Sequence, residues 1–404
     1  MKATPHTISS GTIAVVFSRF GPYHLARLKG ARREIESAGG SLAAIAVASS
    51  DSVYAWDRVE GEANNPVHVI FGDRAYEEIP AADLADRLRA LLDELDPIAV
   101  ALPGWAFLEA RVGLRWCQKK KRAAILMSES AKGDHFRLWP RELAKQFLVR
   151  QFHAALVGGR RHAEYARLLG IPRACIFWGY DAVDNDYFIR ESDRVRSRAA
   201  AERAAGGLPK RYYLTSSRFV PKKNLAGLLR GYALHTARVP DSPDLVVCGD
   251  GPLRSSLIEL ARELKLESRV HFVGFIQYAD LPRYYALAEA FILASTTEQW
   301  GLVVNEAAAA ALPLLVSNRC GSAPELVNEG ENGFTFCPMT PQAIAEAFEK
   351  LPVDSAVLQR YGQRSRELVA AHSPRIFGEK LLEAARMGLA RLGREDLGPP
   401  GGLV

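Results

Sequence analysis

The sequence has 404 residues, 48% of them hydrophobic and 24% charged, with a formal net charge of +6 at pH 7. This composition is ordinary for a globular protein, and the length exceeds what one hydrophobic core usually supports, so we expect two domains. No run of about 18 uncharged apolar residues occurs, so no transmembrane helix is expected. The first residues lack the apolar core of a signal peptide, which predicts a cytoplasmic protein.

The excess of positive charge suits an anionic ligand or an anionic membrane surface. No segment combines basic and aromatic residues in a known nucleic-acid pattern, so no nucleic-acid partner is expected. The five cysteines are odd in number and form no CxxC pair. A disulfide framework and a zinc site are therefore not indicated.

Apolar strands alternate with helical segments along the first half of the chain. Strands are expected at residues 11–18, 41–48, 67–71, 98–102, 123–127 and 154–157, and helices at 25–39, 81–95 and 106–120. The opening strand, loop and helix are typical of a nucleotide-binding fold, although G-x-G-x-x-G is absent. This alternation predicts a parallel sheet with helices on both faces.

The second half of the chain shows the same alternation of strands and helices. Strands are expected at residues 211–216, 244–248, 270–273, 290–294 and 314–316, and helices at 194–206, 225–235, 302–312 and along 341–392. We therefore predict an α/β protein with two doubly wound, Rossmann-like parallel-sheet domains that face each other across a cleft. The expected boundaries are 1–180 and 181–372. Residues 373–404 are expected to form a helix that packs back on the first domain, followed by a flexible tail.

Charged residues and glycines follow the strands of the second domain. Arg218 and Lys223 come after the first strand, the turn 249–251 after the next, and Glu298 and Glu306 after a later one. The carboxyl ends of parallel strands share one edge of a sheet, where ligands bind. Two cations and an amide-rich turn suit a diphosphate, and carboxylates accept hydrogen bonds from a diol. The set predicts a pocket for a nucleotide-activated sugar.

Several of these features also have simpler interpretations. Glu306 could be a helix N-terminal charge favoured by the macrodipole. The pair Asp184 and Asp186 is similar to a metal-binding DxD motif, but these residue types form turns, and we favour a turn. Residues 135–152 form a basic amphipathic segment in which Phe147, Leu148 and Phe152 lie at helical spacing. It could contact anionic lipid or a lipid-linked acceptor. We favour the alternative, a helix with one core face and one solvated basic face.

Residues 211–350 resemble the retaining family-4 glycosyltransferases of GT-B fold. The motifs appear in the family's order: S-R-x-x-x-x-K-N, V-C-G-D-G-P-L, V-x-F-V-G-F, E-x7-E and G-S-A-P-E-L-V. Residues 179–188 are also similar to the family's N-G-V-D-x-x-x-F hinge. The first half resembles the family only in its alternation of strands and helices.

The resemblance implies roles for individual residues. Glu298 would bind hydroxyls of the donor sugar, Glu306 would bind the ribose, and Arg218 and Lys223 would neutralise the leaving diphosphate. The donor-binding set would also include Gly249, Gly251, Gly274, Phe275, Gly301, Leu302 and Val303. The first domain would bind the acceptor and the second the nucleotide sugar. No metal and no other cofactor is expected, because the cations and helix dipoles supply the positive charge.

The sequence specifies the candidate site residues of the first domain less well. Where family members carry a histidine after a first-domain strand, this chain has Ser128-Glu129-Ser130, so Glu129 is a candidate to orient the acceptor or contact the sugar. A loop residue that caps the next segment is the equal alternative for Glu129. His24, Gly21 and His135 are further cleft candidates. The first loop, G-P-Y-H, departs from the family's Gly-Gly pair.

The sequence thus predicts a metal-independent, retaining glycosyltransferase that moves a sugar from a UDP- or GDP-sugar to a glycan, a lipid-linked or a small-molecule acceptor. A nucleotide-sugar 2-epimerase or a glycoside phosphorylase of the same fold is one alternative. A non-catalytic sugar-nucleotide or glycan-binding subunit is another. The expected location is cytoplasmic, with peripheral contact at the inner membrane face through residues 135–152 as an option.

Overall fold

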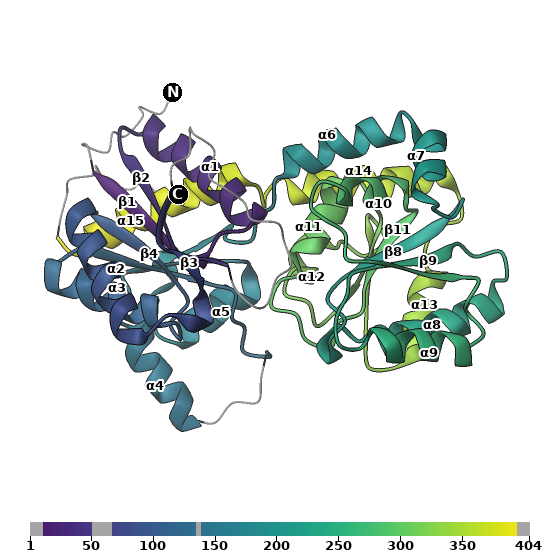
Figure 1. Cartoon of the computed structure of the whole chain (residues 1–404), viewed down its shortest axis with the longest axis horizontal. Coiled ribbons are helices and arrows are strands. Elements are labelled where there is room, and N and C mark those ends of the chain that lie inside the picture. Colours follow the sequence, from purple (N-terminus) through teal and green to yellow (C-terminus); the bar gives the residue numbers. More distant parts are fainter. Residues whose placement is uncertain (1–10, 51–66, 135–138, 394–404) are drawn as a thin grey trace. The chain divides into compact units, whose positions relative to one another are not determined.

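The computed structural model of the protein describes residues 11–50, 67–134 and 139–393. The chain forms two compact units: residues 1–183 with 372–404, called unit 1, and residues 184–371, called unit 2. Each unit is a parallel sheet covered by helices (Figure 1).

Unit 1 is built on a seven-stranded sheet of order β3-β2-β1-β4-β5-β6-β7, in which every pair of neighbours is parallel. Its strands are β1 (Thr12–Arg19), β2 (Ser41–Ser50), β3 (Val67–Ala75), β4 (Ala99–Pro103), β5 (Ala123–Ser128), β6 (Ala154–Val157) and β7 (Ile176–Trp178). The strand order reverses between β1 and β4, which is the switch point of a doubly wound sheet.

Helices cover both faces of this sheet. They are α1 (Pro22–Ser37), α2 (Ala81–Leu95), α3 (Leu108–Lys120), α4 (Trp139–Val149), α5 (Arg160–Leu168) and α15 (Pro374–Ala390), with short 3-10 turns η1 (Tyr76–Glu78) and η2 (Arg173–Cys175). Helices α1 and α15 pack on one face, around Leu28 and Phe377. Helices α2, α3 and α5 pack on the other, around Leu88 and Trp116. Apolar residues alternate between the two faces along the strands, as in a sheet buried on both sides.

Unit 2 has a six-stranded parallel sheet of order β10-β9-β8-β11-β12-β13. Its strands are β8 (Tyr212–Ser216), β9 (Asp244–Cys248), β10 (Val270–Gly274), β11 (Ala290–Leu293), β12 (Leu314–Ser317) and β13 (Gly333–Phe336). The reversal of strand order lies between β8 and β11, which are hydrogen-bonded neighbours.

The helices of unit 2 also lie on both faces of the sheet (Figure 1). They are α6 (Asn185–Arg196), α7 (Ala199–Gly206), η3 (Pro221–Lys223), α8 (Leu225–Arg238), α9 (Arg254–Glu263), α10 (Leu281–Leu287), α11 (Leu302–Ala309), α12 (Ala323–Leu326), α13 (Pro341–Glu349) and α14 (Ser355–Val369). Helices α8, α9 and α13 enclose one core with the strands, around Leu228 and Phe348. Helices α6, α10, α11 and α14 pack on the other side.

The predicted fold class of two doubly wound parallel-sheet α/β domains is confirmed. The predicted first helix is wrong at its start, because α1 begins at Pro22 and not at residue 25. The single helical region expected along 341–392 is three helices. The single helix expected at 194–206 is two helices, α6 from Asn185 and α7 to Gly206. Strand β13 and helices α10 and α12 were not predicted.

Candidate functional site

The candidate site in unit 2 lies where the strand order reverses. Arg218 and Lys223 follow the carboxyl end of β8, and Glu298 follows the carboxyl end of β11. Because β8 and β11 are adjacent, these segments emerge side by side at the edge of the sheet. Ligands of open α/β sheets bind at this position.

Lys223 and Glu298 form an ion pair, with side chains only 12% and 10% exposed. The Ser295 hydroxyl, which is fully buried, donates a second hydrogen bond to the Glu298 carboxylate at 3.2 Å. The sequence placed both charges at one site. The structure shows in addition that they satisfy each other, so the carboxylate is held in one orientation by a cation and a hydroxyl.

The backbone around Glu298 is anchored on both sides. Thr296 donates its N–H to the carbonyl of Lys222 at 2.8 Å, which ties this loop to the one that follows β8. The Glu298 carbonyl accepts from Gly321 N–H at 3.0 Å, and its own N–H donates to Arg319, so the loop also pairs with the segment after β12. Three strand ends therefore fix the position of the carboxylate.

Gly301 makes the transition into α11 possible. Its φ is +93°, a left-handed conformation that costs glycine little, and an added Cβ would approach the side chains of Leu293 and Glu298 within 3.2–3.3 Å. The buried Trp300 ring donates from Nε1 to the Asn305 side chain at 2.8 Å, which braces the first turn of the helix. Leu302 and Val303 open this helix and are half-buried.

Glu306 lies on α11 and is fully buried. Its Oε2 accepts a hydrogen bond from the Tyr285 hydroxyl at 2.6 Å. Burial raises the pKa of nearby Tyr278, and the charge of Glu306 adds to that rise. A ribose hydroxyl could reach this carboxylate only after neighbouring atoms moved, so the expected ribose contact stays a prediction.

The turn after β9 brings backbone amides to the same edge. Gly249 has a φ of +127°, and a Cβ there would meet the carbonyl oxygen of Ser217 at 1.9 Å. Gly251 has a φ of +152°, and a Cβ there would lie 2.8–3.1 Å from the backbone of Phe219. Only glycine allows the β8 and β9 loops to approach this closely.

Gly274 and Phe275 end β10, the neighbour of β9. The Gly274 carbonyl accepts from Gly249 N–H at 2.7 Å, and a Cβ on Gly274 would meet open space. Phe275 is 39% exposed, so it offers an apolar surface beside the glycine turn. Arg218 follows β8 and is exposed, so its guanidinium group is accessible to an anionic ligand.

In unit 1, the candidates Gly21 and His24 cap a helix. Gly21 is the N-cap of α1, and its N–H donates to His24 Nδ1 at 3.1 Å. Burial, together with the charges of Arg27 and Arg19, lowers the pKa of His24 to about 3, so the ring is neutral at physiological pH. His24 thus belongs to the first turn of α1 and not to the loop expected from the sequence.

Glu129 is half-buried directly after β5. Burial, and after it the charge of Glu129, raises the pKa of Asp181, a fully buried residue in the segment that resembles the family's hinge. The candidate His135 lies outside the described residues, as do residues 136–138 of the predicted amphipathic segment.

Some polar groups at these strand ends were not singled out from the sequence. In unit 2 they are Ser295 and Tyr285, described above. In unit 1, Glu109 is fully buried at the start of α3 and accepts hydrogen bonds from Ser18 at 2.5 Å and Tyr76 at 2.9 Å. A carboxylate in the first turn of a helix after a buried strand is a sequence signal that could have identified Glu109.

Helix α4 exposes a stripe of apolar side chains to solvent. Trp139, Leu143 and Phe147, at positions i, i+4 and i+8, are 74%, 52% and 78% exposed. The predicted apolar spacing of Phe147 with Leu148 and Phe152 is therefore wrong, because Leu148 packs against the core and Phe152 is buried beyond the end of the helix. Figure 1 shows α4 projecting from the sheet of unit 1.

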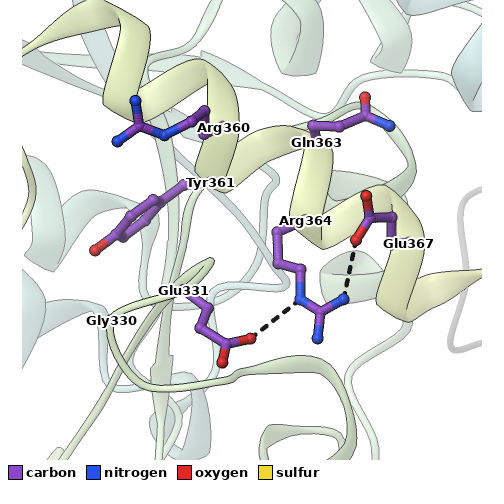
Figure 2. A pocket seen from close by; sticks show the side chains of 7 residues that line it. All are labelled: Gly330, Glu331, Arg360, Tyr361, Gln363, Arg364 and Glu367. Carbon is purple, nitrogen blue, oxygen red and sulfur yellow. Dashed lines mark hydrogen bonds and ion pairs between the residues drawn. The ribbon is translucent and has the colours of Figure 1, made fainter.

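One other feature of the described residues does not coincide with these strand ends. A surface pocket is lined by Gly330, Glu331, Arg360, Tyr361, Gln363, Arg364 and Glu367 (Figure 2). It lies on α14 and the segment before β13, at the amino end of that strand, and Arg364 forms ion pairs there with Glu331 and Glu367.

Among residues 11–50, 67–134 and 139–393, no three His, Cys, Asp or Glu side chains are grouped as a metal site. Asp184 caps α6 by accepting from Tyr187 N–H at 3.0 Å, and Asp186 lies in the first turn of that helix, so the turn expected at this position is the start of a helix. Over the same residues, no helix has the length and apolar composition needed to cross a bilayer.

Residues 200–368 match the family model described as glycosyl transferases group 1 and carry such a domain. A relative from Mycobacterium tuberculosis, the GDP-mannose-dependent alpha-(1-6)-phosphatidylinositol monomannoside mannosyltransferase, is 31% identical over 195 residues. That match covers 45% of this chain and 49% of the relative, so the chain spans about half the length of this curated relative. The protein of the same name from Mycolicibacterium smegmatis is 28% identical over 287 residues, covering 68% of this chain and 72% of the relative.

Among solved structures, sucrose-phosphate synthase from Thermosynechococcus elongatus superposes with a TM-score of 0.71 at 19% identity. The superposition covers 94% of this chain and 100% of that one. At this identity the likeness establishes the fold, a pair of Rossmann-like α/β domains of GT-B type.

Proposed function

We propose that the protein is a glycosyltransferase that transfers a sugar from a nucleotide diphosphate sugar to an acceptor with retention at the anomeric carbon. The observation that carries the proposal is the shielded Lys223–Glu298 pair at the β8/β11 switch point, within the group 1 domain. A buried charge pair held by a third polar group costs free energy to desolvate, so it favours a ligand role over a purely stabilising one.

Each part of the site suits one part of such a donor. Glu298 would accept hydrogen bonds from sugar hydroxyls, and Lys223 and Arg218 would meet the diphosphate. Because Gly249 has no side chain, the loops after β8 and β9 pack closely, and backbone amides of this turn would meet the diphosphate. Phe275 would pack against the base. The related mannosyltransferases are named for GDP-mannose, which makes a GDP-sugar the first donor to test.

Catalysis would rest on electrostatic stabilisation of the leaving diphosphate. As the glycosidic carbon–oxygen bond breaks, negative charge grows on the β-phosphate, and the cations of Arg218 and Lys223 and the N-terminus of α11 are placed to offset it. A donor phosphate oxygen would take the proton of the acceptor hydroxyl as that hydroxyl bonds to the same face of the sugar. No metal is needed in this scheme.

The test measures release of UDP or GDP from a panel of donor sugars, with and without acceptor and with and without EDTA. Proton NMR of the product then reports the anomeric configuration. Turnover that survives EDTA and a product that keeps the donor's configuration are expected. Strict dependence on a divalent ion, or inversion, contradicts the mechanism. Donor binding without turnover on any acceptor favours a non-catalytic binding subunit, and formation of an epimerised donor favours an epimerase.

We also propose that α4 contacts an anionic membrane surface, where a lipid-linked acceptor would be found. The polar side of this helix faces the protein, since Glu142 accepts from Tyr165 at 2.7 Å and pairs with Lys145. Trp139, Leu143 and Phe147 are exposed along it, and Arg141 in the helix and Arg150 just after its end are also exposed. Apolar side chains flanked by cations are typical of helices that lie in a lipid interface.

Vesicle co-sedimentation tests this contact. The wild type should bind vesicles that contain phosphatidylglycerol and release them at high salt. Phe147→Glu should abolish binding, and Val353→Glu, at a residue 93% exposed in unit 2, should leave it unchanged. Equal binding by both variants would contradict the α4 assignment.

A further inference from the structure

The surface pocket of unit 2 has a volume of about 510 Å³ (Figure 2). One of its walls is helix α14, and the other is the turn at residues 330–331 that precedes β13. The pocket therefore lies at the amino end of a strand, whereas Arg218, Lys223 and Glu298 follow the carboxyl ends of β8 and β11. Its volume lies within the range of roughly 300–1,000 Å³ that is usual for small-molecule sites. A ligand here would be separate from a donor bound at those three residues.

Both walls of the pocket are held in place by buried groups. Asn332, fully buried after the turn, donates from Nδ2 to the Ser365 hydroxyl of α14 at 3.1 Å. The same hydroxyl donates to the Leu312 carbonyl at 2.7 Å. A Cβ on Gly362 of α14 would lie 2.1 Å from the Ala311 carbonyl oxygen, so the helix packs directly on the chain before β12. The walls are thus preorganised, which lowers the cost of binding a ligand between them.

The formal charges that line the pocket cancel. Arg364 lies between Glu331 and Glu367 and forms ion pairs with them at 3.1 and 2.9 Å (Figure 2). Hydrogen bonds from the Asn328 amide and from Arg364 hold the pKa of Glu331 below its ordinary value. Arg360 adds the second positive charge, so two arginines meet two glutamates. A balanced set gives an anion no net attraction and favours an uncharged polar ligand.

Polar atoms on both walls have no partner within the described part of the chain. Glu331 and Glu367 each meet Arg364 through Oε2, so the Oε1 of each can accept a further hydrogen bond. The side chains of Arg360 and Gln363 are exposed and make no hydrogen bond or ion pair with any described residue. The hydroxyls of a sugar both donate and accept, so they suit an array of carboxylate oxygens and N–H donors.

Tyr361 supplies the apolar part of the pocket. The residue is half-buried, and its ring lies near that of Phe334, with the ring centroids 6.4 Å apart. Figure 2 shows Tyr361 and Arg360 on one side of the pocket and Arg364 with its two carboxylates on the other. The C–H groups of a sugar ring carry a slight positive charge and pack on the negative face of an aromatic ring. One aromatic ring beside convergent polar groups therefore suits a pyranose.

We propose that this pocket binds one uncharged pyranose unit of a glycan, as a second site apart from the donor site. The sugar ring would lie against Tyr361, and its hydroxyls would bind Arg360, Gln363 and the Oε1 atoms of Glu331 and Glu367. A glycan product held here would stay with the enzyme between transfers, and only this consequence rests on the proposed function.

Saturation-transfer difference NMR of the whole chain, titrated without donor, tests the site. The probes are maltohexaose and an α-(1-6)-linked mannohexaose. Binding with a Kd of about 1 mM is expected, because exposed polar groups also bind water. Arg360→Ala and Gln363→Ala should each weaken binding by about threefold to tenfold, the size expected for lost hydrogen bonds. Gln359→Ala, at an exposed residue of α14 outside the pocket, should leave binding unchanged.

Equal binding by the wild type and both pocket variants, or binding of neither oligosaccharide, overturns the proposal. So does inorganic phosphate that displaces the sugar and loses its own binding in Arg360→Ala, because the pocket would then be an anion site. Both substituted residues are exposed, and an unchanged thermal unfolding curve checks that the variants fold. Because no donor is present, a chain that binds sugar here but transfers none refutes the proposed function alone. A chain that transfers sugar without binding it here refutes the pocket alone.

Discussion

The Lys223–Glu298 pair makes a quantitative prediction, because unit 2 contains a matched pair on the same two strands. Arg211 precedes β8 and Glu289 precedes β11, and they form an ion pair at 2.6 Å at the amino ends of these strands. The Arg211 and Glu289 side chains are 49% and 25% exposed, against 12% and 10% for Lys223 and Glu298. The Lys223–Glu298 pair is therefore the more buried of the two.

The perturbation is neutralisation of one partner, by Glu298→Gln or Glu289→Gln. Removing one partner of a buried ion pair costs about 3–5 kcal/mol, because the remaining charge stays buried without compensation. An exposed pair contributes about 0.2–1 kcal/mol. We therefore expect Glu298→Gln to lower the free energy of unfolding several-fold more than Glu289→Gln does.

A double-mutant cycle isolates the coupling between the two charges. Urea unfolding of the wild type, Lys223→Met, Glu298→Gln and the double variant should show that the double variant loses much less than the sum of the single losses. The same cycle with Arg211→Met and Glu289→Gln is the control. A Glu298→Gln loss no larger than that of Glu289→Gln would refute the argument from burial.

Activity separates the two pairs in a second way. Glu298→Gln and Lys223→Met should each lower kcat/KM for the donor by at least about a hundredfold, which corresponds to about 2.7 kcal/mol of transition-state stabilisation. Glu289→Gln should leave kcat/KM within about twofold. Full transfer activity in a folded Glu298→Gln enzyme would refute the assignment of this carboxylate to the donor sugar.

Three further predictions concern the backbone, a histidine and a buried tyrosine. Gly249→Ala should destabilise unit 2 far more than Gly274→Ala in thermal unfolding, because both have positive φ but only Gly249 would press its Cβ onto a carbonyl, at 1.9 Å. The pKa of His24 is lowered to about 3 in the folded protein, so the unfolded chain binds more protons between pH 3 and 6.5. Stability should therefore fall as the pH drops through this window, by at most about 1.4 kcal/mol per pH unit, and His24→Gln should flatten that slope in urea titrations. Tyr285→Phe removes the hydroxyl that donates to Glu306 and should lower the free energy of unfolding by about 1–3 kcal/mol, while Tyr284→Phe, on the same helix, should change it less.

The fold was predictable because both sheets are buried on both faces. Strands such as Ala99–Pro103 and Ala123–Ser128 are nearly continuous apolar runs, which are typical of central strands in a parallel sheet. Strand β13, Gly333–Phe336, escaped prediction because Gly333 and Thr335 interrupt its apolar run, whereas the equally short β6, β11 and β12 are apolar almost throughout. Its apolar run is too short to separate a strand from a loop.

The helices were predicted less well where start signals were overlooked. Thr340, Asp354 and Ser373 each accept a backbone hydrogen bond as N-caps of α13, α14 and α15, and two of them precede a proline. These residues divide a region that apolar spacing alone presents as continuous. Pro22 marks the start of α1 in the same way, and that signal would have placed His24 inside the helix.

The candidate site was predictable as a set of strand ends but not as a set of contacts. Charges after β8 and β11 converge because the topology makes these strands neighbours. Nothing in the spacing of Glu298 and Glu306 shows that the first pairs with Lys223 while the second is buried against Tyr285. Those outcomes depend on how loops from three strands pack, which a single sequence does not reveal.

The two ion pairs at opposite ends of β8 and β11 show why pairing alone does not identify a site. Both join a cation that flanks β8 to a carboxylate that flanks β11, and both would be counted equally in a list of salt bridges. At the amino ends, water solvates the charges and the pair contributes little. At the carboxyl ends, Gly301 packs on the Glu298 side chain, Ser295 donates a hydrogen bond to it, and both charged side chains are largely shielded from water. A sugar hydroxyl that reaches Glu298 would therefore meet a carboxylate whose hydrogen bonds water does not weaken, and the same shielding makes its loss costly.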